Sequence, residues 1–256
     1  MEGQRRILDL CVDAGETLLA NGAEIYRVQQ TMEIIARSYG ARSFHVYVLT
    51  NGLFASMEDG GAVQSAAVRS TPRVEMNLGR ISAVNALSRE IVAGRVPLEE
   101  AFARLAQIRA TRGLPGWLMV SASAFSAACF CYLFGGRGAE CLASLAAGLL
   151  LYAFLCLAAR RISKIMSNLC GAALAAFFCV ACYACGFGET LGRMVVGAVI
   201  PLIPGVSFTN GIRDIADGDY LSGTIRLLDA LLVYVCIAIG VGLAFWLGQR
   251  IFGGVL

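Results

Sequence analysis

The stretch Pro201-Leu-Ile-Pro-Gly205 interrupts one of several long apolar segments that lie between Leu114 and Phe252. Proline lacks a backbone N–H and fixes φ, so two prolines this close together end a helix that would otherwise continue. Polar and charged side chains follow directly. In a lipid bilayer, irregular backbone is tolerated only where protein surrounds it or where it lines a water-filled cavity. The sequence therefore predicts a broken membrane helix beside a transport path.

The composition indicates a membrane protein with a polar N-terminal part. The 256 residues are 57% hydrophobic and 15% charged, whereas soluble domains carry about 25% charged residues. Most charges precede residue 113, and no cleavable apolar signal opens the chain. We therefore expect an N-terminal α+β cytoplasmic domain over residues 1–112 and an all-α bundle of about five transmembrane helices over residues 113–256. The net charge of +3 is too small to indicate a nucleic-acid partner.

The first 112 residues combine helical and strand periodicity. Apolar residues spaced three and four apart from Ile7 to Leu18 predict a helix that ends at Asn21-Gly22. A β-branched and aromatic run before Asn51-Gly52 predicts a hairpin with its two-residue turn at that dipeptide. A second turn is expected at residues 58–61. The further expected elements are a helix at 23–39, strands at 44–50, 53–57 and 62–70, and helices at 77–93 and 97–110.

The second part contains segments that match a bilayer in length, because about 20 apolar residues cross the hydrocarbon core. Arginine and lysine concentrate in the loops of one side, so the positive-inside rule predicts a cytoplasmic N-terminus and an outer C-terminus. We expect a multi-pass protein of the bacterial inner membrane. The predicted spans are residues 115–134, 140–159, 167–187, 191–208 and 224–248.

The residues after the break can recognise a small carboxylate. Arg213 can hold a carboxylate through two parallel hydrogen bonds, and Asn210 offers both a donor and an acceptor. Ser207 or Thr209 could cap a new half-helix, whose N-terminus would attract anions. The predicted substrate-binding residues are Pro204, Gly205, Ser207, Thr209, Asn210 and Arg213.

Two carboxylates could couple a proton, namely Asp214 and Asp229. Asp214 follows Asn210 by four residues and shares its helix face. Asp229 lies three residues after Arg226 in apolar sequence, and it is either the partner of that arginine or a titrating group. Asp219 is expected to cap the last span. The predicted structural or gating residues are Pro201, Asp217, Gly218, Asp219, Gly223 and Arg226.

The sequence predicts no catalytic residue, metal site or cofactor. The run Cys179-x-x-Cys182-x-x-Cys185 lacks the fourth ligand of a cluster motif, and cysteine also suits helix packing in membranes. The alternative function is a membrane-anchored, hydrolase-like enzyme with its activity in residues 1–112. A membrane scaffold that only stabilises a partner is a third. An anchor does not need a broken helix with clustered charges, so we rank a secondary exporter first.

Nearly the whole chain resembles the bacterial threonine/serine exporter family. The matching stretches are Ala14-Gly-Glu-Thr-Leu-Leu-Ala-Asn-Gly-Ala-Glu-Ile-Tyr-Arg27, Met32-Glu-Ile-Ile-Ala-Arg-Ser-Tyr-Gly40, Asn77-Leu-Gly-Arg-Ile-Ser-Ala-Val-Asn85, Pro201-Leu-Ile-Pro-Gly-Val-Ser-Phe-Thr-Asn-Gly-Ile-Arg-Asp214 and Gly218-Asp-Tyr-Leu-Ser-Gly223. The resemblance implies export of threonine, serine or dicarboxylates such as succinate, and we expect the proton gradient to drive it. About five spans correspond to the larger subunit of the family's split, two-protein form. That form implies a small integral-membrane partner of about four to five spans, and a homo-oligomer is also compatible with the sequence.

Overall fold

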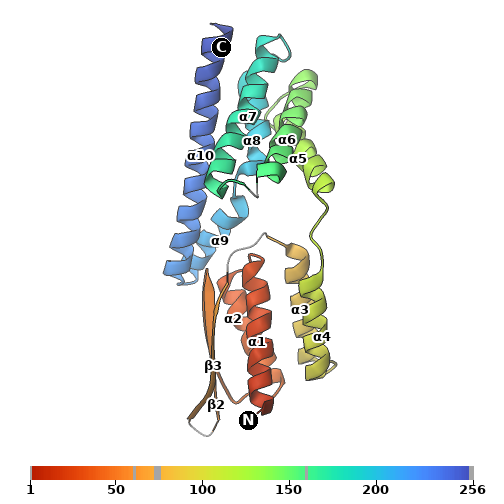
Figure 1. Ribbon diagram of the computed structural model, residues 1–256, viewed down its shortest axis with the longest axis vertical. Helices are drawn as coiled ribbons and strands as arrows, with labels where there is room; N and C mark the ends of the chain where they lie inside the picture. Colours follow the sequence, from red (N-terminus) through yellow and green to blue (C-terminus); the bar gives the residue numbers. More distant parts are fainter. Residues whose placement is uncertain (1, 60–61, 72–75, 159–160, 254–256) are drawn as a thin grey trace. The chain divides into compact units, whose positions relative to one another are not determined.

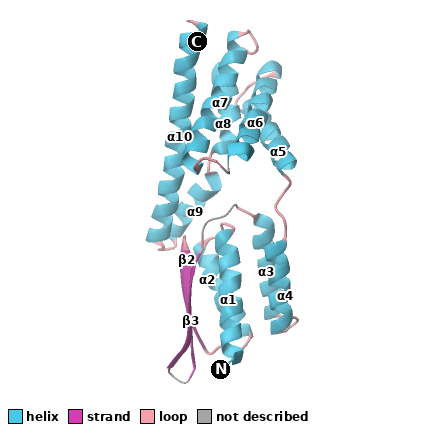
Figure 2. Cartoon of the chain, viewed as in Figure 1, coloured by secondary structure: helices cyan, strands magenta, loops and turns pink. Residues whose placement is uncertain are grey.

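The computed structural model describes residues 2–59, 62–71, 76–158 and 161–253, and these residues are mostly helical (Figure 2). The chain divides into two compact units. The first unit comprises Met1–Gly113 and Val206–Leu227, and the second comprises Leu114–Gly205 and Leu228–Leu256. A helical segment that follows the proline break in the sequence therefore belongs to the first unit.

The first unit contains helices and one small sheet. Its elements are α1 (Glu2–Ala20), α2 (Ile25–Ser38), β1 (Ser43–Leu49), β2 (Gly52–Asp59), β3 (Ala62–Ser70), α3 (Leu78–Val92) and α4 (Leu98–Ala110), joined by α9 (Gly205–Ala216) from Val206 onward and by the beginning of α10 (Tyr220–Phe252). The three strands form an antiparallel sheet in the order β1-β2-β3. Helix α1 lies beside β2 and β3 (Figure 1), and α2 contacts β1. Fully buried side chains of this core include Leu8, Leu10, Met32, Ile35 and Leu53.

The first hairpin differs from the expected one by one residue. Leu49 pairs with Gly52, so the turn is formed by Thr50 and Asn51 rather than by Asn51-Gly52. Gly52 belongs to the strand and not to the turn because the backbone of β3 lies close to it. A Cβ on Gly52 would lie 2.7 Å from the carbonyl oxygen of Arg69 in β3. Glycine is therefore required here for strand contact. The second expected turn includes residues 60–61, which lie outside the described residues.

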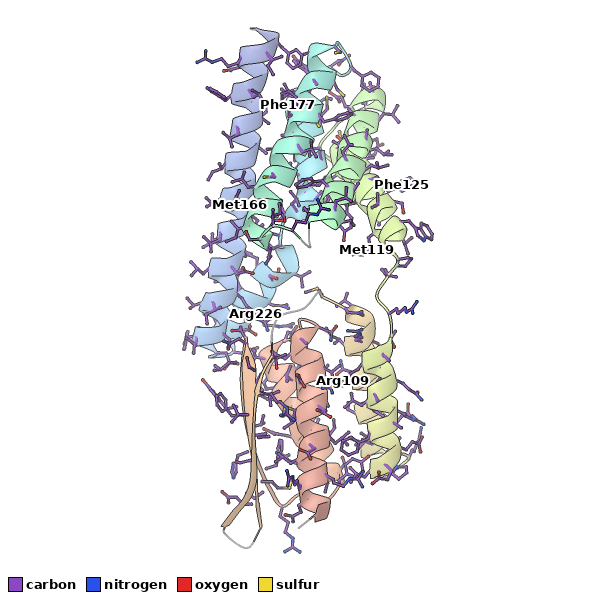
Figure 3. The ribbon with its side chains drawn as sticks, viewed as in Figure 1. Arg109, Met119, Phe125, Met166, Phe177 and Arg226 are labelled. Atoms are coloured by element: carbon purple, nitrogen blue, oxygen red, sulfur yellow. The ribbon has the colours of Figure 1, made fainter. Side chains whose placement is uncertain are left out.

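The second unit is a helical bundle with small residues at its contacts. It contains α5 (Gly116–Leu133), α6 (Gly138–Ala158), α7 (Lys164–Ala184), α8 (Leu191–Val199), the short 3-10 helix η1 (Ile200–Leu202) and most of α10. A Cβ on Gly148 would lie 2.7 Å from the Cβ of Ala127, and one on Gly197 would lie 2.8 Å from the Ala127 carbonyl oxygen. Large side chains such as Phe125 are exposed on the outside of the unit (Figure 3).

Four described helices, α5, α6, α7 and α10, are long and apolar enough to cross a membrane. A bent pair, α8 with η1 and then α9, would make a fifth span. The expected span at 191–208 is thus the one that the structure breaks. Helix α10 has 33 residues, which corresponds to about 50 Å of helix, whereas the hydrocarbon core is about 30 Å thick. Its uncharged part is residues 230–249, so Arg226 and Asp229 precede that part.

The cysteines are all free among the described residues. Cys156 lies in the last turn of α6 and Cys185 at the C-terminal end of α7, and both are exposed. Cys11 is buried in the core of the first unit, and this burial raises the pKa of its thiol well above the ordinary value. A thiol in this state is a poor nucleophile at neutral pH.

Candidate functional site

The break in the apolar segment lies between η1 and α9. Ile203 is extended, with φ −65° and ψ 120°, as expected for a residue that precedes proline. The Gly205 N–H then donates to the Ile203 carbonyl over 2.8 Å, and α9 begins at Gly205. Ser207 and Thr209 therefore lie inside α9. The expectation that one of them caps the half-helix is wrong, because the helix starts directly after Pro204.

A tight turn of Asp217, Gly218 and Asp219 connects α9 to α10. Gly218 has φ +93°, a left-handed conformation that glycine adopts without strain. The Asp219 N–H donates to the Asp214 carbonyl over 2.8 Å, and the Gly218 N–H donates to the Ile215 carbonyl over 3.1 Å. These two bonds form a Schellman motif that ends α9. Asp219 stands just before α10, where its carbonyl accepts the first-turn hydrogen bond from Gly223.

The two helices on either side of this turn approach each other at two glycines. A Cβ on Gly223 would lie 2.7 Å from the Gly211 carbonyl oxygen and 2.5 Å from a side-chain carbon of Ile215. Any larger residue at Gly223 would therefore push the helices apart. Residues 206–227 form a helical hairpin, which we call the α9–α10 hairpin, and the predicted structural residue Gly223 lies at its crossing.

A buried ion pair fixes this hairpin to the rest of the first unit. Arg226 Nε lies 3.1 Å from Asp214 Oδ2, and the two side chains are 2% and 3% exposed. Arg226 also donates through Nη2 to the carbonyl oxygen of Ala23 over 3.0 Å, and Asp214 accepts a hydrogen bond from the N–H of Ile25. Ala23 lies in the turn between α1 and α2, and Ile25 is the first residue of α2. A buried charge is costly unless it is paired and hydrogen-bonded. The two charges and their backbone partners therefore join the α9–α10 hairpin to this turn and to the start of α2.

Arg213, the predicted carboxylate-binding residue, has an ion-pair partner in the same turn. Its Nη1 donates to Glu24 Oε1 over 2.6 Å. The Arg213 side chain is 58% exposed and that of Glu24 is 24% exposed. The sequence did not single out Glu24, because it precedes Arg213 by 189 residues and no local pattern links the two. Asn210 is half-buried, one helical turn before Arg213.

Asp229 lies in a different environment from Asp214. Its Oδ2 is 3.0 Å from Nζ of Lys164, the first residue of α7; the Lys164 side chain is exposed and the Asp229 side chain is partly exposed. The sequence left open a pair between Asp229 and Arg226. In the structure Arg226 pairs with Asp214, and Asp229 pairs with Lys164. In each case the partner lies on another helix.

Besides Asp214, the structure contains a buried carboxylate that the sequence did not single out. Glu140, in the first turn of α6, is 4% exposed and accepts hydrogen bonds from the N–H groups of Arg137 over 2.9 Å and Thr190 over 2.6 Å. The guanidinium of Arg193 lies 3.9 Å away. Glu140 thereby caps the N-termini of α6 and α8 within the second unit. Glu140 follows Arg137 by three residues and precedes an apolar run, as the glutamate of a capping box does. This spacing is the sequence pattern that could have identified Glu140 as a helix cap.

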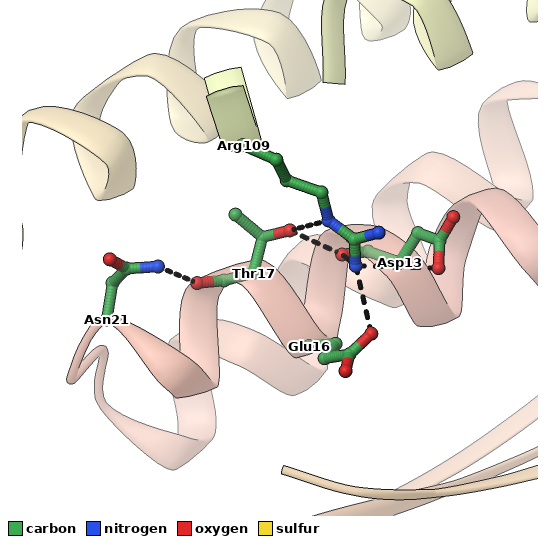
Figure 4. Close-up of polar contacts among 5 residues, drawn as sticks. All are labelled: Asp13, Glu16, Thr17, Asn21 and Arg109. Carbon is green, nitrogen blue, oxygen red and sulfur yellow. Dashed lines mark hydrogen bonds and ion pairs between the residues drawn. The ribbon is translucent and has the colours of Figure 1, made fainter. Parts of the chain in front are cut away.

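A polar cluster within residues 1–112 surrounds Arg109 of α4 (Figure 4). Arg109 donates to Thr17 Oγ1 over 2.8 Å, to Glu16 Oε2 over 2.9 Å and to the Asp13 carbonyl over 3.0 Å. Burial raises the pKa of the Asp13 carboxyl, and the charge of Arg109 opposes that shift. All these contacts tie α4 to α1, and none of them prepares a nucleophile.

Known proteins that are similar to this chain are named as transport proteins. It is 24% identical over 252 residues to the "Probable succinate transporter subunit YjjP" of Escherichia coli (strain K12), with 96% of each chain covered. It is 22% identical over 249 residues to the "Probable threonine/serine exporter" of Mycobacterium tuberculosis (strain H37Rv), which covers 93% of this chain and 45% of that protein. No solved structure matches the chain.

These names indicate a transporter rather than an enzyme, and the apolar helices are those of a membrane protein. The model of one family, described as threonine/serine exporter (ThrE), matches residues 9–248, which is most of the chain and includes the α9–α10 hairpin. The protein therefore belongs to the threonine/serine exporter family.

Proposed function

We propose that this chain is one subunit of a secondary exporter that moves threonine, serine or dicarboxylates such as succinate out of the cell, driven by the proton gradient. The observation that carries the proposal is the helix break at Ile203-Pro204, followed by α9 with the exposed guanidinium of Arg213. Broken helices with polar ends are how many secondary transporters build their substrate sites. The names of the relatives supply the two substrate classes.

The substrate carboxylate would bind Arg213, with Asn210 as a further hydrogen-bonding group on the same side of α9. The two residues are three apart, which places them on adjacent turns of one helix face. Pro204 and Gly205 would form the wall of the site, because they lie at the break between η1 and α9. Ser207 and Thr209, in the first half of α9, would add hydroxyl groups to it.

Of the two carboxylates proposed to couple a proton, Asp229 offers the cleaner test. Replacing Asp214 would leave the guanidinium of Arg226 buried without its counter-charge, so loss of transport could follow from misfolding alone. The Asp229 side chain is partly exposed, and its partner Lys164 is exposed as well. Asp229→Asn should remove the dependence of efflux on an imposed pH gradient and leave the amount of membrane-inserted protein unchanged. Efflux that still follows the gradient would exclude Asp229 as the coupling group.

The orientation and the partner of the chain belong to the same proposal. Residues 1–112 would form an α+β domain in the cytoplasm that regulates or gates transport, and the C-terminus would lie outside the inner membrane. One relative is named a subunit, which supports a second component here. We propose a small integral-membrane partner of about four to five spans.

The test is efflux of preloaded threonine, serine and succinate from cells that make the chain with its partner. Arg213→Ala should abolish efflux of the transported substrate, because the exposed guanidinium is the proposed carboxylate-binding group. Arg37→Ala is the matched control, since Arg37 also forms an exposed ion pair with a glutamate of α2. Normal efflux in Arg213→Ala cells, with the protein in the membrane, would contradict the site assignment.

A further inference from the structure

Arg213 binds one carboxylate of the protein itself and keeps part of its guanidinium open. Its Nη1 donates to Glu24 Oε1 over 2.6 Å, while more than half of the Arg213 side chain is exposed. A guanidinium has five N–H donors in a planar fork. A ligand carboxylate can therefore approach the remaining donors of Arg213 and would then lie beside the carboxylate of Glu24.

The backbone holds Glu24 in this place from both sides. The residue before it, Ala23, accepts a hydrogen bond from Arg226, and the residue after it, Ile25, donates one to Asp214. Both partners are buried and belong to the α9–α10 hairpin, as Arg213 does. The proximity of Glu24 to Arg213 is thus imposed by groups other than the exposed pair itself.

The Glu24 side chain does not cap the helix that it precedes. Glu24 occupies the N-cap position of α2, yet its side chain makes no capping hydrogen bond. Serine, threonine, asparagine and aspartate are the residues favoured at this position. The Glu24 carboxylate is directed to Arg213 instead.

An arginine and a glutamate side by side are complementary to a zwitterion. The α-carboxylate of an amino acid would bind Arg213, and its ammonium group would bind Glu24. A dicarboxylate would instead place its second negative charge near Glu24, and juxtaposed like charges oppose binding.

We propose that Glu24 is a specificity-determining residue of the Arg213 site, where its carboxylate accepts the ammonium group of an amino acid and repels the second carboxylate of a dicarboxylate. The inference rests on the proposed function, because it assigns the substrate carboxylate to Arg213. It also gives residues 1–112 a direct part in substrate choice, in addition to the gating role proposed above.

The test compares binding of radiolabelled threonine and succinate to the purified full-length chain in detergent. Glu24→Gln keeps the size of the side chain and removes its charge. We expect the ratio of threonine affinity to succinate affinity to fall about five- to twenty-fold, because each exposed charge contact changes binding by a factor of up to about five. Glu24→Asp should retain a preference for threonine.

Glu33→Gln is the matched control, because Glu33 lies on α2, the helix that Glu24 precedes, and also forms an ion pair with an arginine, Arg37. It should leave the affinity ratio unchanged. An unchanged ratio in Glu24→Gln, or an equal loss of both ligands, would overturn the role of Glu24 and leave the exporter proposal standing. If the natural chain binds neither ligand, or if Arg213→Ala binds as the natural chain does, the site assignment itself fails and the inference falls with it.

Discussion

The two units bury different kinds of side chain. The core of the first unit consists of large apolar residues such as Leu10 and Met32, whereas the second unit buries mainly alanine, glycine and cysteine and directs residues such as Phe125 and Trp246 outward. Burying large apolar groups stabilises a fold in water. In lipid this gain disappears, and close contact of helices through small residues takes its place. The first unit should therefore be sensitive to lost volume, and the second to added volume.

The largest effect is expected from the buried ion pair of the first unit, Asp214 with Arg226. Asp214→Ala would leave a guanidinium buried without a counter-charge, which costs about 3–5 kcal/mol of unfolding free energy. The thermal midpoint of the full chain in detergent would fall sharply. The double change Asp214→Leu with Arg226→Met should recover much of that loss, and a double variant as unstable as the single one would contradict the explanation.

Removing volume from the first core should have the next largest effect. Met32 is fully buried between α2, α1 and β2, so Met32→Ala should cost about 2–5 kcal/mol through lost burial and the cavity left behind. Amide hydrogen exchange of α2 in the full chain would detect it. Exchange rates equal to those of the natural protein would show that this core tolerates cavities.

Adding volume to the second unit should destabilise it by a smaller amount. A Cβ on Gly240 of α10 would lie 2.5 Å from the carbonyl oxygen of Leu169, whereas one on Gly242 would meet no atom within 4 Å. Gly240→Ala should therefore cost about 1–3 kcal/mol. Gly242→Ala, the matched control two residues later, should not lower stability, because alanine has the higher helix propensity. Equal thermal midpoints for the two variants would contradict the close packing of α7 and α10.

The smallest effect is expected from lost volume on the outer face of the second unit. Leu157 at the end of α6 is 76% exposed, so Leu157→Ala should alter the thermal midpoint by the equivalent of less than about 0.5 kcal/mol. The same leucine-to-alanine change at Leu10 of the first unit provides the contrast. A large loss at Leu157 would indicate that a partner subunit covers this face.

Local periodicity was enough to predict most elements of both units. The expected helices at 77–93 and 97–110 agree with α3 and α4 to within one residue at each end, and the break after Pro201 lies where the prolines placed it. The register of the first hairpin could not be predicted, because it depends on the approach of Gly52 to Arg69 across the sheet.

The candidate site was predicted only in part. Arg213 and Asp214 were named from their neighbours in the sequence, but their partners Glu24 and Arg226 lie on other elements. Glu140 accepts a hydrogen bond from Thr190, which lies 50 residues later at the start of another helix. Pairs of this kind depend on the tertiary fold, so no periodic or local pattern reveals them.

The placement of two native cysteines makes the direction of insertion measurable without any change to the protein. Cys156 and Cys185 lie at the C-terminal ends of α6 and α7, two successive helices that each match a bilayer in length, so they would face opposite sides of the membrane. A charged maleimide that cannot cross membranes, added to intact cells, should modify Cys185 under the proposed orientation. Modification of Cys156 instead, read by mass spectrometry of the two peptides, would reverse the assignment of every loop.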